Sequence, residues 1–331
     1  MPTIFAPERE WRSHRRRSTL LCLLCSAVLF GASAPLPHWF AVASARSIVL
    51  STDKADRFGQ IDLTGPPTAM HFSTDGSELY IAIESGPGKT TLVRASRFGR
   101  SIALSSPLEG TVVAIQHDRR LPLLYLAVSG ADGGLSVMDE GLVEQRRVPV
   151  CQVTRALVIT SNSERAYLLC GDDRIAEIDL RGTRVLRFRQ FPEACDAARI
   201  ALSRTENVVY IPCRVAGQLW HLDRETFKRT AAYSVPAGVF AVAATPDRNR
   251  VVLTVPAEDR VVLADPYSRT IVASVQTPAR PTDVVVADGI AYVLTEKGVV
   301  GLVPSRARIR RHLPTSRVGS FLALWPSWRG A

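Results

Sequence analysis

Residues 235–255 read VPAGVFAVAATPDRNRVVLTV, and residues 259–265 continue as DRVVLAD. This stretch contains a proline before a short apolar strand, a Pro-Asp turn, a β-branched strand, a loop, and a third strand that ends in an aspartate. Valine and leucine runs favour strands, whereas proline and aspartate favour the turns between them. The stretch therefore predicts one unit of a four-stranded antiparallel sheet.

The same unit recurs through most of the chain. Its second strand carries a tyrosine, or in one unit a valine, at a regular position: Tyr80, Tyr125, Tyr167, Tyr210, Val252 and Tyr292. The intervals between these ruler positions are 45, 42, 43, 42 and 40 residues. Such a period, carrying strands only, is typical of a β-propeller, and the two-residue alternation excludes helical solenoids.

The repeats predict an all-β, seven-bladed β-propeller of four-stranded antiparallel blades. Six blades fall near residues 65–107, 108–150, 151–191, 192–235, 236–277 and 278–317. Residues 47–62 align without gaps on residues 250–265, and residues 318–326 resemble a first strand and its turn. We therefore expect a seventh blade from residues 46–64 plus 318–331, in which strands from both ends of the chain close the ring.

A second regular feature is an aspartate after the third strand of a unit. It occurs at Asp62, Asp139, Asp179, Asp223 and Asp265. Aspartate commonly accepts hydrogen bonds from the amides of a following turn, so we expect a structural role for it.

The first 45 residues have the pattern of an export signal. A cationic segment at residues 12–17 precedes an apolar core at residues 20–32, and small residues follow at 32–34 and again at 43–45. Cleavage could follow Ala34 or Ala45, and a folded domain starting near Arg46 favours the latter. An uncleaved anchor is the alternative, but Pro35 and Pro37 would interrupt it. We expect an exported protein in the periplasm, at the cell surface or secreted, with no membrane span after cleavage.

One segment resembles a known repeat family. Residues 73–82, STDGSELYIA, are similar to the S-P-D-G-x-x-x-Y-V-x core of YVTN-type propeller repeats. Those repeats occur in bacterial surface and periplasmic proteins and in lactonase-like and cytochrome d1-like propellers. The resemblance implies a seven-bladed propeller in the envelope, and it transfers no active residue.

The segment after the signal contains four cysteines in two adjacent units, Cys151, Cys170, Cys195 and Cys213. Because a first strand begins and a second strand ends at the same edge of a blade, all four should gather on one face. An even, clustered set in an exported protein predicts two disulfides. Three pairings are open, and the pairing within each blade is favoured over pairings that cross between blades. Reduced thiols and a metal site are alternatives, although C-x-x-C spacing is absent.

Composition limits the classes of partner. The chain has 331 residues, a formal net charge of +10 and a pI near 9.7. This charge is scattered, so nucleic-acid binding is not expected. Only residues 306–312, RARIRRH, form a dense basic run. Its alternation fits the solvated face of an outer strand, and a surface for an anionic partner is the alternative.

Several side chains are candidates for a ligand site near the entry of inner strands. The cations and carboxylates are Arg155, Asp196, Arg199, Arg280 and Asp283, and the histidines that could line a channel are His71 and His117. Together they could bind a small anionic or sugar-like ligand, or act on it as acid and base. Salt-bridged rim residues and packed histidines are the structural alternatives. The GKT at residues 88–90 lacks the earlier glycine of a phosphate-binding loop.

The sequence favours a non-enzymatic function. We expect an exported, monomeric propeller that acts as a binding or protein-interaction scaffold in the envelope, with no cofactor and no metal. One alternative is a lactonase-like hydrolase or lyase that works from the central funnel. Another is a partner or subunit of a periplasmic redox enzyme. The propeller fold alone does not decide among these functions.

Overall fold

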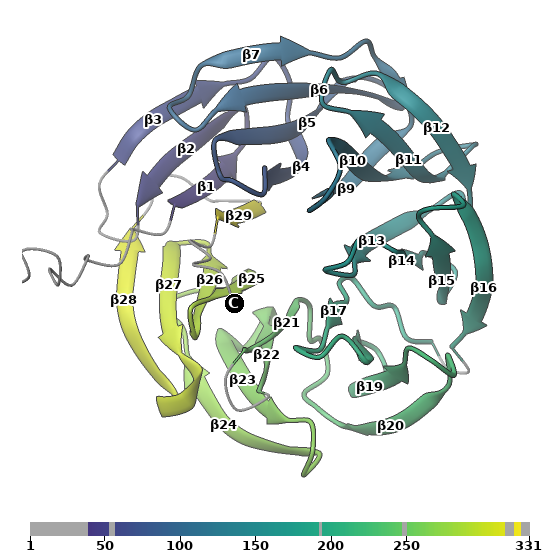
Figure 1. Cartoon of the computed structure of the whole chain (residues 1–331). Coiled ribbons are helices and arrows are strands. Elements are labelled where there is room, and N and C mark those ends of the chain that lie inside the picture. Colours follow the sequence, from purple (N-terminus) through teal and green to yellow (C-terminus); the bar gives the residue numbers. More distant parts are fainter. Residues whose placement is uncertain (1–38, 53–56, 192–193, 247–249, 315–320, 326–331) are drawn as a thin grey trace, which may run out of the picture. The chain divides into compact units, whose positions relative to one another are not determined.

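The structure is a computed structural model that describes residues 39–52, 57–191, 194–246, 250–314 and 321–325. These residues form 29 strands and two short 3-10 helices. The strands build seven antiparallel sheets around a common centre (Figure 1). The predicted seven-bladed, all-β propeller is therefore confirmed. Most of the predicted export signal and the Asp247 of the predicted turn lie outside the described residues.

Blades 1 to 3 are consecutive along the chain. From its inner edge outward, blade 1 contains β4 (Pro67–Phe72), β5 (Glu78–Gly86), β6 (Lys89–Ser96) and β7 (Ser101–Leu104), and β8 (Leu108–Glu109) also pairs with β6. Blade 2 contains β9 (Thr111–His117), β10 (Leu123–Ser129), β11 (Gly134–Asp139) and β12 (Glu144–Pro149). Blade 3 contains β13 (Thr154–Ile159), β14 (Arg165–Cys170), β15 (Arg174–Asp179) and β16 (Arg184–Gln190).

Blades 4 to 6 follow the same order. Blade 4 contains β17 (Ala201–Leu202), β18 (Val208–Cys213), β19 (Gln218–Asp223) and β20 (Arg229–Ser234). Blade 5 contains β21 (Val242–Ala244), β22 (Val251–Val255), β23 (Arg260–Asp265) and β24 (Thr270–Gln276), with η1 (Pro256–Glu258) before β23. Blade 6 contains β25 (Pro281–Ala287), β26 (Ile290–Thr295), β27 (Gly298–Val303) and β28 (Arg308–Pro314), with η2 (Pro304–Arg306) before β28.

Blade 7 joins the two ends of the chain. From the inside outward it contains β29 (Phe321–Trp325), β1 (Trp39–Ser44), β2 (Ser47–Thr52) and β3 (Arg57–Asp62). The alignment of residues 47–62 made β2 the second strand, but the structure makes it the third, because β1 lies between β29 and β2. The blade thus begins before Arg46. The small apolar residues of β1 resemble the end of a signal peptide, which hid this strand in the sequence.

The ruler tyrosines fill the space between neighbouring blades. Tyr80 is fully buried and belongs to the same hydrophobic cluster as Leu124 and Leu126 of the next blade. Its hydroxyl donates to Glu78 at 3.0 Å, and that of Tyr125 donates to Asp118 at 2.8 Å. A large ring whose hydroxyl is hydrogen-bonded fills this space between blades without leaving a buried polar atom unpaired. This explains why the tyrosine recurs in five of the seven blades.

Three of the recurring aspartates, Asp139, Asp223 and Asp265, accept turn amides as expected, whereas Asp179 contacts Arg165 and Arg184. Asp139 accepts the N–H of Val143 at 2.9 Å, and Asp265 accepts the N–H of Tyr267 at 2.9 Å. Asp62 differs, because it ends the fourth strand of blade 7 rather than a third strand. Among the described residues, no helix has the length and apolar character needed to cross a membrane.

Candidate functional site

The inner strands of the blades can be compared position by position. In blades 1 to 6 the first strand pairs with the second. The residues paired there with the ruler positions are His71, Gln116, Val158, Ala201, Ala243 and Val285. Two residues earlier in the same segments stand Ala69, Ala114, Ala156, Arg199, Ala241 and Asp283. Four blades therefore carry alanine at a position where blade 4 carries Arg199 and blade 6 carries Asp283. Both charged residues lie at one level of the propeller centre.

Two connected cavities lie at this centre. The outer one, about 370 Å³, is lined by Arg155, Asp196, Arg199 and Arg214 together with smaller side chains. The inner one, about 250 Å³, is lined mainly by alanine, valine, isoleucine and leucine. Its wall also contains His71, Gln116, Arg155, Arg199 and Asp283. Since Arg155 and Arg199 line both cavities, the outer cavity is the mouth of the inner one.

Asp196 is the centre of the ionic contacts at the mouth. It accepts hydrogen bonds from the Arg155 guanidinium and from Arg214, whose Nε lies 3.2 Å from its Oδ2. Partial burial alone would raise the pKa of Asp196, but the hydrogen bonds from Arg214 and Arg155 lower it overall. The carboxylate is therefore ionised at neutral pH.

Arg199 differs from its two neighbours. Its Nη1 contacts only the carbonyl oxygens of Ala198 at 3.3 Å and Arg155 at 3.5 Å, and its guanidinium lies 6.0 Å from the Phe240 ring centroid. Within the described part of the chain, no carboxylate forms an ion pair with Arg199. Three arginines thus line the outer cavity with one carboxylate, Asp196, and Asp283 lies in the wall of the connected inner cavity.

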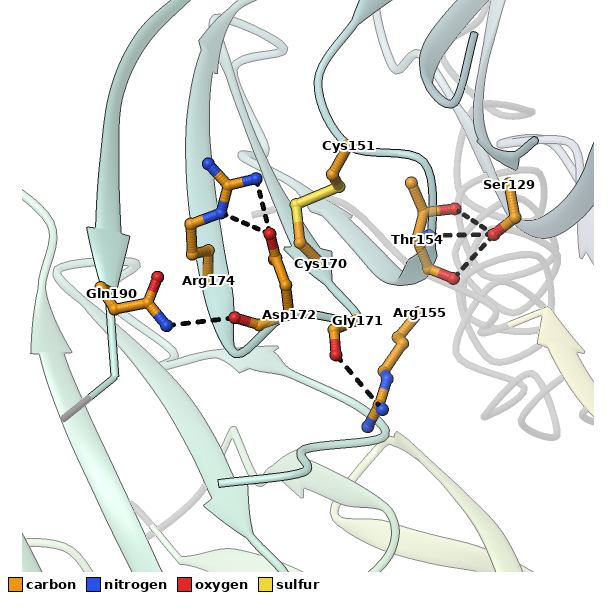
Figure 2. The surroundings of a disulfide bond; sticks show 9 residues. All are labelled: Ser129, Cys151, Thr154, Arg155, Cys170, Gly171, Asp172, Arg174 and Gln190. Carbon is orange, nitrogen blue, oxygen red and sulfur yellow. Dashed lines mark hydrogen bonds and ion pairs between the residues drawn. A yellow bond between two sulfur atoms is a disulfide. The ribbon is translucent and has the colours of Figure 1, made fainter. Parts of the chain in front are cut away.

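Two disulfides flank the mouth. They join Cys151 to Cys170 and Cys195 to Cys213, so the predicted pairing within each blade is confirmed. Figure 2 shows the first bond and the adjacent Gly171, whose carbonyl accepts a hydrogen bond from Arg155 Nη2 at 3.5 Å. Both disulfides thus lie at the edge of the blade where the arginines converge.

The second disulfide acts on the ionic cluster itself. Asp196 directly follows Cys195, and Arg214 directly follows Cys213, so the bond holds the two ion-paired residues side by side. Asp173 adds support, because its carboxylate accepts the N–H groups of Cys195 at 3.3 Å and Asp196 at 2.8 Å. Asp196 itself has a left-handed φ of 46°.

The structure brings together most of the candidates from the sequence. Arg155, Asp196, Arg199, Asp283 and His71 line the two cavities, as stated above. Arg280 is exposed and is not part of either wall. What these residues do remains a prediction.

His117 points away from the channel. It is buried beside Tyr80, with the ring centroids 5.6 Å apart, and its Nδ1 donates to the Asp118 carbonyl at 2.6 Å. It is therefore a packed histidine of the interface between blades 1 and 2.

Sequence reasoning missed Arg214, which completes the cluster. The signal for it was its place directly after Cys213, since a residue beside a predicted disulfide on the ligand face must lie near that face.

His71, which lines the inner cavity, has a strongly lowered pKa. Burial, with smaller contributions from His117 and Arg119, lowers the pKa of His71 to about 4. His71 is consequently neutral at pH 7, and its ring is a weak base there. No group of three or more histidine, cysteine, aspartate or glutamate residues in the described segments has the arrangement of a metal site.

Comparison with known proteins bears on the fold. No protein-family model matches the chain, and no curated protein sequence matches it. Among solved structures it is similar to a 6-phosphogluconolactonase-like protein from Bacteroides uniformis, with a TM-score of 0.71 and 11% identity over 87% of this chain and 99% of that chain. The chain has a lactonase-like propeller fold.

Two further solved propeller structures are also similar to this chain. Apo AztD from Citrobacter koseri gives a TM-score of 0.57 and 11% identity, over 87% of this chain and 98% of that chain. Hydrazine synthase from Kuenenia stuttgartiensis gives a TM-score of 0.64 and 14% identity, over 82% of this chain and 90% of that chain. At such identities the likeness of these propellers concerns the fold alone, and function has to be inferred from the site.

Proposed function

We propose that the protein is an exported envelope propeller that binds a small anionic ligand at the arginine-lined mouth of its central channel. The observation that carries the proposal is the convergence of Arg155, Arg199 and Arg214 on one cavity that contains a single carboxylate, Asp196. Guanidinium groups bind carboxylates and phosphates through paired, charge-assisted hydrogen bonds. An anionic ligand would offset part of the positive charge at this mouth.

Binding is better supported than turnover by the acid–base groups at the site. Asp196 is ionised and held by two arginines, which makes it a poor proton acceptor. His71 has a pKa of about 4, whereas a general base works best with a pKa near the operating pH. The cavities therefore provide surfaces that contact a ligand, rather than a pair of residues suited to act as catalytic acid and base.

Export is supported by the covalent structure. Disulfides persist in oxidising compartments such as the periplasm and the cell surface, and this chain holds two of them beside the proposed site. The cationic segment and apolar core at the start of the sequence fit the same destination.

Isothermal titration of the oxidised protein with inorganic phosphate and with succinate tests the proposal. We expect one binding site, and we expect Arg199→Gln to weaken it by about 10- to 100-fold, since a hydrogen bond to a charged group contributes roughly 1.5–3 kcal/mol. Arg146→Gln, at an exposed position on blade 2, is the matched control and should bind like the wild type.

Three results would contradict the proposal. The first is the absence of anion binding in the oxidised protein, and the second is equal affinity in the Arg199→Gln and Arg146→Gln variants. The third is hydrolysis of a lactone that is lost in His71→Gln, which would establish the hydrolase instead.

A further inference from the structure

A second basic surface lies on blade 6, at the end of the blade away from the arginine mouth. The mouth residues Gly171 and Arg214 follow second strands, whereas Arg306 lies between the third and fourth strands, β27 and β28. In an antiparallel blade, these two kinds of turn lie at opposite ends. The second surface is therefore separate from the proposed ligand site.

Three arginines converge on one hollow at this surface. A cavity of about 670 Å³ is lined by Arg306, Arg308 and Arg310 and by the turn that contains Asp288 and Gly289. All three arginines are exposed. β28 is the outermost strand of its sheet, as the alternation of the basic run predicted. Three cations and one carboxylate give the hollow two excess positive charges.

Arginines of other outer strands are of two kinds: some form ion pairs, whereas Arg146, Arg189 and Arg229 form none within the described residues. On β12, Arg147 forms an ion pair with Glu144 at 2.7 Å, and on β16, Arg187 pairs with Glu177 at 2.5 Å. In the described structure, Arg306, Arg308 and Arg310 have no ion pair with any acidic side chain. The distinguishing feature of blade 6 is that three such arginines line one hollow.

Apolar side chains adjoin the same edge. Tyr267, in the corresponding turn of blade 5, is 74% exposed, and Ile271 and Val272 of β24 are each 43% exposed. Ala273 of β24 and Ile309 of β28 pack into one hydrophobic cluster, so the outer parts of blades 5 and 6 are neighbours, as Figure 1 also shows. Cationic and apolar groups thus occur together on this rim.

We propose that this rim, formed by Arg306, Arg308, Arg310, Tyr267, Ile271 and Val272, docks on an anionic phospholipid surface. The arginines would meet lipid phosphates, and the hollow between them would admit one headgroup. Arginines near such a surface and aromatic or aliphatic side chains at its interface both favour adsorption. A soluble linear polyanion would engage the arginines alone and leave the apolar residues in water, so a lipid surface fits the rim better.

Co-sedimentation of the full oxidised protein with vesicles tests this docking. We expect binding to vesicles that contain phosphatidylglycerol, little binding to pure phosphatidylcholine, and weakening by added salt. The triple variant Arg306→Ala/Arg308→Ala/Arg310→Ala should lose about 100-fold in affinity, since each arginine near an anionic surface contributes roughly a factor of five.

A matched control removes the same charge elsewhere. The variant Arg100→Ala/Arg146→Ala/Arg204→Ala changes three exposed arginines on blades 1, 2 and 4 and should bind vesicles nearly as the wild type does. The melting temperatures of both triple variants show that they are folded.

The proposal fails if the two triple variants lose equal affinity, because net charge would then be the cause. It also fails if neutral vesicles bind as well as anionic ones. Binding to dextran sulfate without binding to vesicles would identify a polyanion partner instead. Full competition by millimolar glycerol phosphate would indicate a soluble-anion pocket and would equally overturn surface docking.

Discussion

Blade 4 and blade 7 fix their inner segments in opposite ways. In blade 4, β17 pairs with β18 through only two residues, and the segment from Cys195 to Ile200 leaves the ladder to carry Asp196 and Arg199. A disulfide ties that segment to the end of β18. In blade 7, β29 pairs with β1 over five residue pairs and has no covalent link to it.

The difference shows what a binding site requires of a propeller blade. A closed ring needs every inner segment to be fixed, normally by the hydrogen bonds of a full ladder. Where the segment is used to present charged side chains, those backbone hydrogen bonds are given up. A covalent bond then supplies the constraint, because it limits the unfolded chain rather than occupying the backbone groups.

Removing β1 should have the largest effect. A chain that begins at Arg46 lacks the strand between β29 and β2, including Phe40, which is 1% exposed, and Ala41, which is fully buried. We expect this chain to show no cooperative thermal transition, because the loss approaches the whole stability of about 5–15 kcal/mol of a domain. Circular dichroism during heating measures this directly.

The control is a chain that begins at Pro35 and retains β1, which should unfold cooperatively. It also corresponds to cleavage after Ala34, so N-terminal sequencing of exported protein should find a start before Trp39. A native start at Arg46, or cooperative unfolding of the shorter chain, would contradict the role of β1.

Removing the blade 4 disulfide should have the second largest effect. Cys195→Ser/Cys213→Ser should lower the free energy of unfolding by about 3 kcal/mol, the value for a loop of this size. It should also weaken phosphate binding about tenfold, since Asp196 and Arg214 would no longer be ordered before binding. Chemical denaturation and titration calorimetry measure the two effects.

The blade 3 disulfide provides the matched control. Its sequence separation of 19 residues is close to the 18 of the blade 4 bond. Cys151→Ser/Cys170→Ser should therefore cost similar stability but less affinity, because neither cysteine is next in sequence to a charged residue of the mouth. Equal losses of affinity in the two double variants would show that the disulfides act on stability alone.

The sequence predicted the parts of this fold that recur. The tyrosines that recur in five blades mark a space between neighbouring blades that a large side chain fills, and the paired cysteines mark an edge where two strands meet. β1 escaped detection because small apolar residues serve equally in a signal peptide and in a buried strand.

The site was predicted less completely than the fold. Arg199 was a candidate because it lies near the start of an inner strand. Arg214 was missed, although its place directly after Cys213 put it beside a predicted disulfide. Arg280 had the same local signal as Arg199, yet its side chain is exposed. Side-chain direction in irregular segments depends on packing that the sequence period does not encode.

A smaller effect is expected in the pH dependence of stability. The pKa of Asp196 is lower in the folded protein than its ordinary value near 3.9, so its ionised form stabilises the fold. This contribution is complete above that ordinary value and is lost as the pH falls through the folded pKa. In Asp196→Asn, the melting temperature should therefore fall less steeply below about pH 4 than in the wild type. Parallel curves of melting temperature against pH would contradict the ionic role of Asp196.

The smallest effect is expected at Arg280. Because this side chain is exposed and outside both cavity walls, Arg280→Ala should change phosphate affinity by less than about twofold, as surface substitutions usually do. Titration calorimetry of Arg280→Ala and Arg199→Gln under the same conditions measures the two affinities. A loss of affinity in Arg280→Ala as large as that in Arg199→Gln would show that the site extends beyond the mouth.

The most direct test of the anion site is a crystal structure of the oxidised protein soaked with selenate, with anomalous data collected at the selenium edge. Selenate is a dianion with the shape of phosphate. We predict an anomalous peak within hydrogen-bonding distance of Arg155, Arg199 and Arg214. A mouth without a peak, in a crystal that shows selenate at other arginines, would contradict the anion site.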